Sequence, residues 1–284
     1  MQYTTIPGTD MQASRICLGT MTFGSPVAGP DAVRLVRYAL EEHGVNFIDT
    51  ANMYEGYNRY AGSAGGVAEE IVGEAVAHRR GDYILATKVG MKVGEAPEDE
   101  NTSPEAIRIQ LRRSLVRMRT DYVDVYYLHR YDPDTEPHAV ARAMGEELRA
   151  GTIRAWGVSN YTAAQLAALL GLGIGLTPSG DDFLCGMLAG SILAGRQREP
   201  FFLALRAEIA AGLSQTNDIS AAFLQCALDG QFSEPVLALT KPEPEAARIA
   251  ESFSKIGHSS GFDTLCGIVF CLRQPAQPLP RETL

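Results

Sequence analysis

Four polar residues follow apolar runs of the sequence, and their types suit the reduction of a carbonyl group. Asp49 and Tyr54 follow VNFI, Lys88 follows ILAT, and His129 follows VYYL. Each residue has an ordinary structural explanation on its own, because aspartates cap helices, lysines are solvated and histidines pack within cores. Four of them after successive apolar runs favour a shared catalytic site.

The chemistry of such a set is specific. A tyrosine phenol is a weak acid at neutral pH, but a nearby lysine ammonium favours the phenolate form, and an aspartate can hold the lysine in place. A histidine beside the phenol can donate a hydrogen bond to a substrate carbonyl and orient it. Such a site protonates a carbonyl oxygen while hydride reaches the carbon. The hydride must come from a cofactor, because no side chain supplies one.

The first 170 residues alternate strands with helices, which places these four residues at one edge of a sheet. This alternation predicts βαβ units and a parallel sheet, and the carboxyl ends of parallel barrel strands meet on the catalytic face. Five strands are predicted, whereas a closed (β/α)₈ barrel needs eight. The predicted strands are 13–21, 45–51, 83–90, 123–129 and 153–160, and the predicted helices are 31–44, 67–79, 103–118 and 137–151, with another beginning at 162.

Four motifs in this segment resemble the aldo/keto reductase family, whose members are NADPH-dependent carbonyl reductases on a (β/α)₈ barrel. The motifs are DTANMYEG, ILATKVG, YVDVYYLHR and GTIRAWGVSNY, and the resemblance covers about residues 3–170. It implies a catalytic tetrad of Asp49, Tyr54, Lys88 and His129. Tyr54 would be the general acid, and Asp49, Ser159 and Asn160 would contact the NADPH cofactor, the last two at the nicotinamide carboxamide. The implied substrate is a small carbonyl compound.

The resemblance also predicts what should surround these motifs. Residues 3–24 are similar to the hairpin and first strand at the start of the family's barrel. After residue 170 a reductase continues with three more strands, whose loops hold the phosphates of the cofactor. The remaining sequence does not show that pattern, because residues 203–213, 220–228 and 244–256 have helical periodicity. Only PVLALT, residues 235–240, is strand-like.

An abrupt change in aromatic composition also divides the chain. All 11 tyrosines lie at or before Tyr161, whereas eight of the 10 phenylalanines lie after it. The glycine-rich stretch that follows, GLGIGLTPSGDDFLCG at 171–186, does not fit a dinucleotide-binding loop. Its G-x-G-x-x-G spacing fails at Leu176, and no clear strand precedes it.

The end of that glycine-rich stretch recurs later in the chain. SGDDFLCG at 179–186 returns as SGFDTLCG at 260–267, so both segments read S-G-x-D-x-L-C-G. Serine, glycine and aspartate suit a helix N-terminus, and the later glycine permits close helix packing. If the two helix ends meet, Asp182 and Asp263 lie near each other beside a pocket. The alternative is that both segments are only well-capped, tightly packed helices.

LTPSGDDFLCGMLAG and IGHSSGFDTLCGIV resemble the C-terminal part of the AllH-like proteins, a family associated with oxamate carbamoyltransferase. The resemblance covers about residues 171–273, and the N-terminal portion of that family is absent. It implies a candidate second site formed by Ser179, Asp181, Asp182, His258, Ser260 and Asp263.

Bulk composition excludes several classes of protein. The net charge of −9 argues against a nucleic-acid partner. No apolar run is long enough to span a bilayer, and no signal peptide is visible, so we expect a cytoplasmic protein without membrane contact. The five cysteines are odd in number and form no C-x-x-C pair, which favours buried, reduced thiols and no metal site.

The sequence therefore predicts an α/β fold: a partial TIM-type barrel of about five βα units with an N-terminal hairpin, followed by a helix-rich C-terminal segment. We place the reductase-like domain at 1–170 and the AllH-like domain at 171–284. The predicted function is NADPH-dependent aldo/keto reduction, impaired by the loss of three βα units. One alternative is a carbamoyltransferase-related protein that acts through the C-terminal segment, and another is a fusion with neither activity. The sequence leaves the oligomeric state open.

Overall fold

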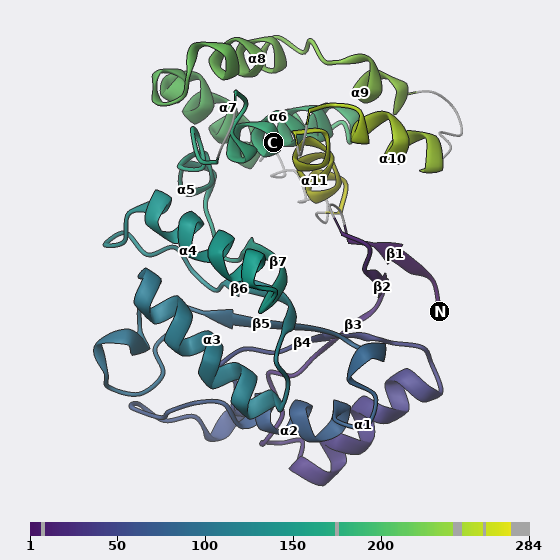
Figure 1. Ribbon diagram of the computed structural model, residues 1–284, viewed down its shortest axis with the longest axis vertical. Helices are drawn as coiled ribbons and strands as arrows, with labels where there is room; N and C mark the ends of the chain where they lie inside the picture. The colour runs from purple at the N-terminus through teal and green to yellow at the C-terminus, as the bar shows by residue number, and fades with distance from the viewer. Residues whose placement is uncertain (7–8, 174–175, 241–245, 258–259, 274–284) are drawn as a thin grey trace, which may run out of the picture. The chain divides into compact units, whose positions relative to one another are not determined.

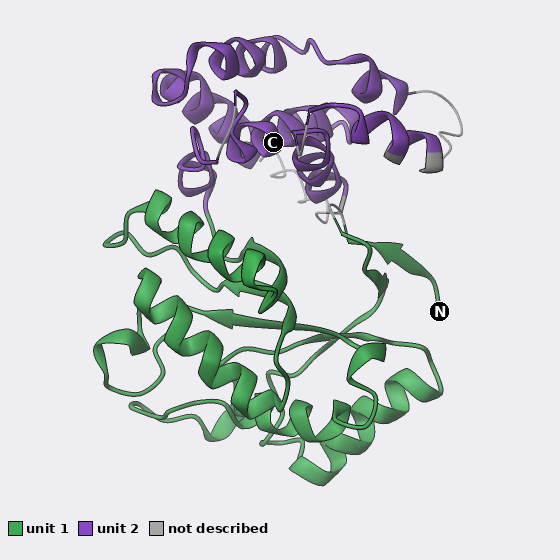
Figure 2. Ribbon diagram, in the orientation of Figure 1, with its two compact units in different colours: residues 1–161 green, residues 162–284 purple. Residues whose placement is uncertain are grey.

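The computed structural model describes residues 1–6, 9–173, 176–240, 246–257 and 260–273 (Figure 1). The chain forms two compact units, Met1–Tyr161 and Thr162–Leu284, which we call unit 1 and unit 2 (Figure 2). The division follows the last tyrosine of the sequence. The domain boundary that the sequence predicts, 170–171, remains a proposal. The short helix α5 (Ala163–Ala167) lies before that boundary but belongs to unit 2, where it packs against helix α7 (Pro200–Gly212).

Unit 1 contains the predicted parallel sheet of five strands, in the order β3-β4-β5-β6-β7. A separate antiparallel hairpin, β1 and β2, precedes it, as the sequence predicts. The strands are β1 (Tyr3–Thr5), β2 (Gln12–Ser14), β3 (Cys17–Gly19), β4 (Phe47–Asp49), β5 (Ile84–Val89), β6 (Val123–Leu128) and β7 (Ile153–Val158), and the helices are α1 (Gly29–Glu41), η1 (Gly56–Asn58), α2 (Val67–Val76), η2 (Arg80–Asp82), η3 (Pro97–Asp99), α3 (Pro104–Met118) and α4 (Pro137–Ala150).

Local sequence explains where the helices of unit 1 begin and end. Ser103 accepts a hydrogen bond from the backbone N–H of Ala106 at 3.2 Å, and Pro104 follows as the first residue of α3. Proline suits that position because its missing N–H would have no partner inside the helix. Helix α4 ends before Gly151, whose φ of 78° lies in the left-handed region that glycine favours.

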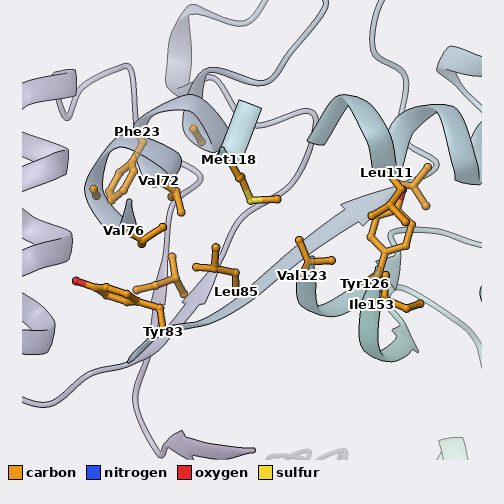
Figure 3. Packing of buried hydrophobic residues seen from close by; sticks show 14 of the residues in the cluster. Phe23, Val72, Val76, Tyr83, Leu85, Leu111, Met118, Val123, Tyr126 and Ile153 are labelled. Atoms are coloured by element: carbon orange, nitrogen blue, oxygen red, sulfur yellow. The ribbon is translucent and has the colours of Figure 1, made fainter. Parts of the chain in front are cut away.

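The two faces of the sheet are covered by different elements. One face packs against α1, α2, α3 and α4 in a cluster that includes Phe23, Val72, Leu85, Met118 and Tyr126 (Figure 3). The opposite face packs against the hairpin through a smaller cluster of Met11, Ala13, Ile84, Ala86 and Val125. The main hydrophobic core of unit 1 thus lies between the sheet and these helices. The sheet is open, because β3 and β7 have no second strand partner among the described residues.

Unit 2 is helical throughout its described part, and one expectation from the sequence is wrong. The strand-like run 235–240 lies largely in helix α9, because Pro235 follows Glu234 in the first turn, where proline favours a helix start. The helical predictions for 203–213 and 220–228 are confirmed, and that for 244–256 is confirmed from residue 246, since 244 and 245 lie outside the described residues. The helices of unit 2 after α5 are α6 (Ser179–Leu193), α7 (Pro200–Gly212), η4 (Leu213–Gln215), α8 (Asp218–Leu228), α9 (Glu234–Ala238), α10 (Ala246–Ser254) and α11 (Ser260–Arg273).

The repeated motif forms the start of α6 and of α11, and these two helices pack more closely than any side chain would allow. A Cβ atom on Gly186 would lie 1.9 Å from the carbonyl oxygen of Thr264, and one on Gly267 would lie 2.0 Å from that of Phe183. Gly186 and Gly267 are equivalent in the two motifs, as are Phe183 and Thr264. The two contacts are therefore the same contact made twice, and the prediction of close helix packing at these glycines is confirmed.

The five cysteines are free thiols, but not all are buried. Cys17 is exposed on the edge strand β3, and Cys226 is exposed on α8, so the expectation of buried thiols is wrong for these two. Cys185 and Cys266 are half-buried, and Cys271 is buried as expected. Within the part of the chain that the structure describes, no three histidine, cysteine or acidic residues group as a metal site. No helix there is long and apolar enough to cross a membrane.

Candidate active site

The parallel register of the sheet brings the predicted tetrad to one edge. Asp49 is the last residue of β4, Lys88 is the penultimate residue of β5, and His129 directly follows β6. Tyr54 lies in the loop after β4, where its N–H donates to Ala51 O at 3.0 Å. Its own carbonyl accepts from the N–H of Ala68 in α2, also at 3.0 Å. Both backbone polar groups of Tyr54 are thus hydrogen-bonded, which fixes the loop at the residue that carries the phenol.

The Lys88 ammonium lies at the centre of the group. It donates to Asp49 Oδ2 at 2.7 Å, to the carbonyl oxygen of Thr50 at 2.9 Å and to the Tyr54 hydroxyl at 3.1 Å. These three contacts use all three donors of an ammonium group. Because the Lys88 side chain is only 7% exposed, its charge is held by these partners and not by bulk water.

His129 is placed beside the phenol as a neutral imidazole. Its ring and that of Tyr54 have centroids 5.9 Å apart at an interplanar angle of 80°. Burial, together with the nearby Lys88 ammonium, lowers the pKa of His129 from 6.5 to about 4. Its Nδ1 atom is buried without a hydrogen-bond partner among the described residues. A neutral imidazole can donate one hydrogen bond and accept another, which suits it to orienting a carbonyl oxygen.

Ser159 and Asn160 follow β7 and lie beside the histidine. The Asn160 side-chain amide donates to the carbonyl oxygen of His129 at 2.8 Å and to Ser159 Oγ at 3.2 Å. Asn160 has a φ of 60°, a left-handed conformation that asparagine adopts more readily than most residues. This turn presents both side chains at the same edge of the sheet as the tetrad.

The residues of the candidate second site have unequal environments in unit 2. Asp181 is buried, and its carboxylate accepts from Gly171 N at 2.7 Å, from Thr216 Oγ1 at 2.5 Å and from Ser220 Oγ at 2.6 Å. Both of its oxygens therefore bond to groups of unit 2 itself, and Asp181 ties the glycine-rich turn to the region around the start of α8.

Asp182 has a different environment, although it neighbours Asp181 in sequence. The pKa of Asp182 is raised to about 6. Burial is the largest cause of the rise, hydrogen bonds from Ser260 and Thr177 oppose it, and the nearby Asp263 and Asp181 carboxylates add to it. Its Oδ2 atom is buried without a hydrogen-bond partner among the described residues.

The predicted second site also includes Ser179 and His258. Ser179 is half-buried in the first turn of α6. His258 lies outside the described residues.

Sequence reasoning missed one contribution to the first site and one buried acid in the adjoining helix α2. The backbone carbonyl of Thr50 is a partner of Lys88, and no residue type signals it. Glu69 of α2 is completely buried, and a signal for it did exist, because Glu69 lies at helical spacing from the apolar residues Val72 and Val76.

Comparison with known proteins identifies the origin of the sheet and its polar edge. The family model "Aldo/keto reductase family" matches residues 15–199, more than half of the chain. The chain belongs to the aldo/keto reductase family. A second family model, "Oxamate carbamoyltransferase subunit AllH", matches residues 169–272. The two matches overlap around α6, and together they confirm the two resemblances seen in the sequence.

Individual aldo/keto reductases match about half of the chain. It is 36% identical over 172 residues to the aldo-keto reductase YhdN of Bacillus subtilis, covering 58% of this chain and 49% of that protein. It is 41% identical over 143 residues to a 6-dehydroglucose reductase of Novosphingobium aromaticivorans, covering 49% and 44%. The chain spans about half the length of these relatives.

A solved structure agrees with this extent. The aldo-keto reductase AKR11C1 of Bacillus halodurans, in its holo form, matches with a TM-score of 0.50 and 31% identity, over 58% of this chain and 52% of that chain. The match supports the assignment of unit 1 as an open portion of a reductase barrel.

Proposed function

We propose that unit 1 carries NADPH-dependent reduction of a small carbonyl compound, with Tyr54 as the general acid. The observation that supports this most strongly is the 3.1 Å hydrogen bond from Lys88 to the Tyr54 hydroxyl, with Asp49 at 2.7 Å on the other side of the ammonium. An ammonium in this position stabilises the phenolate that remains once the phenol has given its proton to the substrate oxygen. His129, neutral beside it, would orient that oxygen.

The residues present suit the nicotinamide end of NADPH but not its phosphate end. NADPH supplies the hydride when bound, and Ser159 and Asn160 would hold its carboxamide beside the tetrad. Their polar side chains follow β7, and His129 Nδ1 is a buried polar atom with no partner among the described residues, so the site is built for a polar occupant. No counterpart of the family's last three strands, whose loops hold the cofactor phosphates, occurs in the described part of unit 2, which is helical.

The proposal is tested by measuring aldehyde-dependent loss of NADPH absorbance with purified, monodisperse protein. Activity above that of the Tyr54→Phe variant supports it. Equal rates in the parent and in Tyr54→Phe, at cofactor concentrations high enough to overcome weak binding, would contradict it. A panel of aliphatic, aromatic and sugar aldehydes covers the substrate classes among which the sequence does not choose.

We propose as a second candidate function that unit 2 binds a ligand of the carbamoyltransferase type at Asp182 and Asp263. The specific support is the match to the AllH family together with the buried Oδ2 atom of Asp182, which has no hydrogen-bond partner in the part of the chain that the structure describes. Asp263 occupies the equivalent position of the second motif, and its charge acts on Asp182. The rise in melting temperature caused by oxamate or carbamoyl phosphate measures binding. If the two carboxylates form one site, Asp182→Asn and Asp263→Asn are non-additive, whereas additive effects contradict a joint site.

A further inference from the structure

Glu69 is a buried acid close to the candidate site that the proposed reaction does not use. It lies in the first turn of α2, and its side chain has no exposed area. An ionised carboxylate in such a place is unfavourable unless several donors reach it. The hydrogen-bond donors that reach the Glu69 carboxylate therefore indicate which elements it connects.

Those partners come from two other elements. The Thr87 hydroxyl, on β5, donates to Glu69 Oε1, and the Arg117 guanidinium, on α3, donates from Nε to Oε2 at 2.6 Å. Thr87 is fully buried. The carboxylate thus ties the start of α2 to a central strand of the sheet and to the neighbouring helix.

The contact with Thr87 and the backbone beside Glu69 each lead to a member of the tetrad. Thr87 directly precedes Lys88 in β5. On the other side, Ala68 directly precedes Glu69, and the Ala68 N–H donates to the Tyr54 carbonyl at 3.0 Å. The chain of contacts Tyr54, Ala68, Glu69, Thr87 and Lys88 therefore closes a ring through the 3.1 Å bond between the phenol and the ammonium.

Two glycines leave the start of α2 little freedom to shift within this ring. A Cβ atom on Gly66 would lie 2.3 Å from Arg117 Cδ, and one on Gly65 would lie 2.2 Å from Asn52 O. Both have positive φ, 88° and 66°, which glycine adopts without strain. The backbone before Glu69 is held against Arg117 on one side and the loop of Tyr54 on the other.

We propose that Glu69 is a positioning residue for the Lys88 and Tyr54 pair, and that it acts through the hydroxyl of Thr87. Its effect on catalysis rests on the proposed function, whereas its effect on the position of Lys88 does not. Replacing Thr87 by valine leaves Glu69 Oε1 buried without a donor. Either α2 must move or water must enter, and both changes loosen the contact between Lys88 and Tyr54.

The rate at which the lysine amines are chemically modified tests the proposal even if the protein has no reductase activity. The chain has four lysines, so reductive methylation with ¹³C-formaldehyde gives few signals, and Lys88→Arg assigns that of Lys88. In the parent, Lys88 should react far more slowly than Lys255, whose side chain is 71% exposed. We expect Thr87→Val to raise the Lys88 rate at least about tenfold, the change in a local equilibrium that about 1.4 kcal/mol produces. Thr87→Ser, which keeps the hydroxyl, should restore protection.

Ser114→Ala is the matched control. Ser114 is also fully buried, and its hydroxyl accepts from Arg117 Nη2 at 3.4 Å, so this contact reaches Glu69 and β5 only indirectly, through Arg117. Ser114→Ala should leave the Lys88 rate at the parent value even if it lowers the melting temperature. If Thr87→Val is insoluble, Thr87→Ala makes the same test without placing a methyl group against the Glu69 carboxylate.

Steady-state kinetics distinguish a positioning role of Glu69 from a role in stability alone. Where the parent reduces aldehydes, Thr87→Val should lower kcat about tenfold with little change in KM. A parent without activity would contradict the proposed function, and the methylation rates would still decide the role of Glu69. Parent-like Lys88 rates in both Thr87→Val and Thr87→Ala, with only a lower melting temperature, would overturn the positioning role.

Discussion

Among the individual residues, Tyr54 carries the most direct prediction. Phenylalanine at position 54 keeps the ring but removes the proton donor, so turnover should fall at least about a hundredfold, the usual scale of general acid catalysis. Cofactor affinity should change little. Tyr57→Phe is the matched control, because Tyr57 lies close by in sequence, in η1, and is 74% exposed. Steady-state kinetics decide the question, and equal activity of Tyr54→Phe and Tyr57→Phe would end the assignment.

His129 carries a prediction about pH and stability. Its pKa is about 4 in the folded protein and 6.5 in its ordinary state, so the unfolded chain binds the proton more tightly between these values. Stability from the neutral imidazole is therefore complete above about pH 6.5 and is lost as the pH falls towards 4. Thermal melts across this range should show a smaller pH dependence in His129→Gln than in the parent. A parallel pair of curves would mean that His129 titrates normally in the folded state.

At the scale of the elements, the close contact between α6 and α11 predicts that substitutions of its two equivalent glycines have similar effects. Gly186→Ala and Gly267→Ala each force a methyl group into a backbone carbonyl at about the same distance. Each should destabilise unit 2 by about 3 kcal/mol, the upper end of typical overpacking costs, and by similar amounts because the contacts are equivalent. Gly145→Ala on α4 is the control, since its Cβ would meet only the flexible end of Arg149 at 3.6 Å.

Denaturant unfolding measures these effects. Circular dichroism follows the helices, and fluorescence of Trp156, the chain's single tryptophan, reports separately on unit 1. A large loss in one glycine variant but not in the other would show that the two repeated motifs are not structurally equivalent.

At the scale of the whole molecule, we predict that the chain binds NADPH weakly. The tetrad and the carboxamide contacts belong to the five βα units of unit 1, whereas the phosphate-binding loops of the family belong to later units. Each charge-assisted hydrogen bond lost from a phosphate removes about 1.5–3 kcal/mol. Two or three such losses weaken binding by on the order of a hundredfold or more. Saturation in a fluorescence titration at low micromolar NADPH would show that unit 2 or a partner restores the phosphate contacts.

The sequence alone determined the elements of unit 1, the order of the tetrad and the presence of two families. These features depend on local patterns: apolar periodicity, Ser103 and Pro104 at a helix start, and polar residues directly after strands. The repeated motif likewise identified the starts of α6 and α11, because its aspartates lie in the first turn of each helix, where a negative charge is favourable.

Only the tertiary structure decided which groups contact one another. Asp181 and Asp182 are identical in type and adjacent, yet one bonds to three groups of its own unit and the other leaves an oxygen without a partner among the described residues. The Thr50 carbonyl reaches Lys88, and Glu69 reaches Thr87 and Arg117, across gaps in sequence of 18 to 48 residues. Such contacts depend on where distant segments pack, and no local pattern encodes that position.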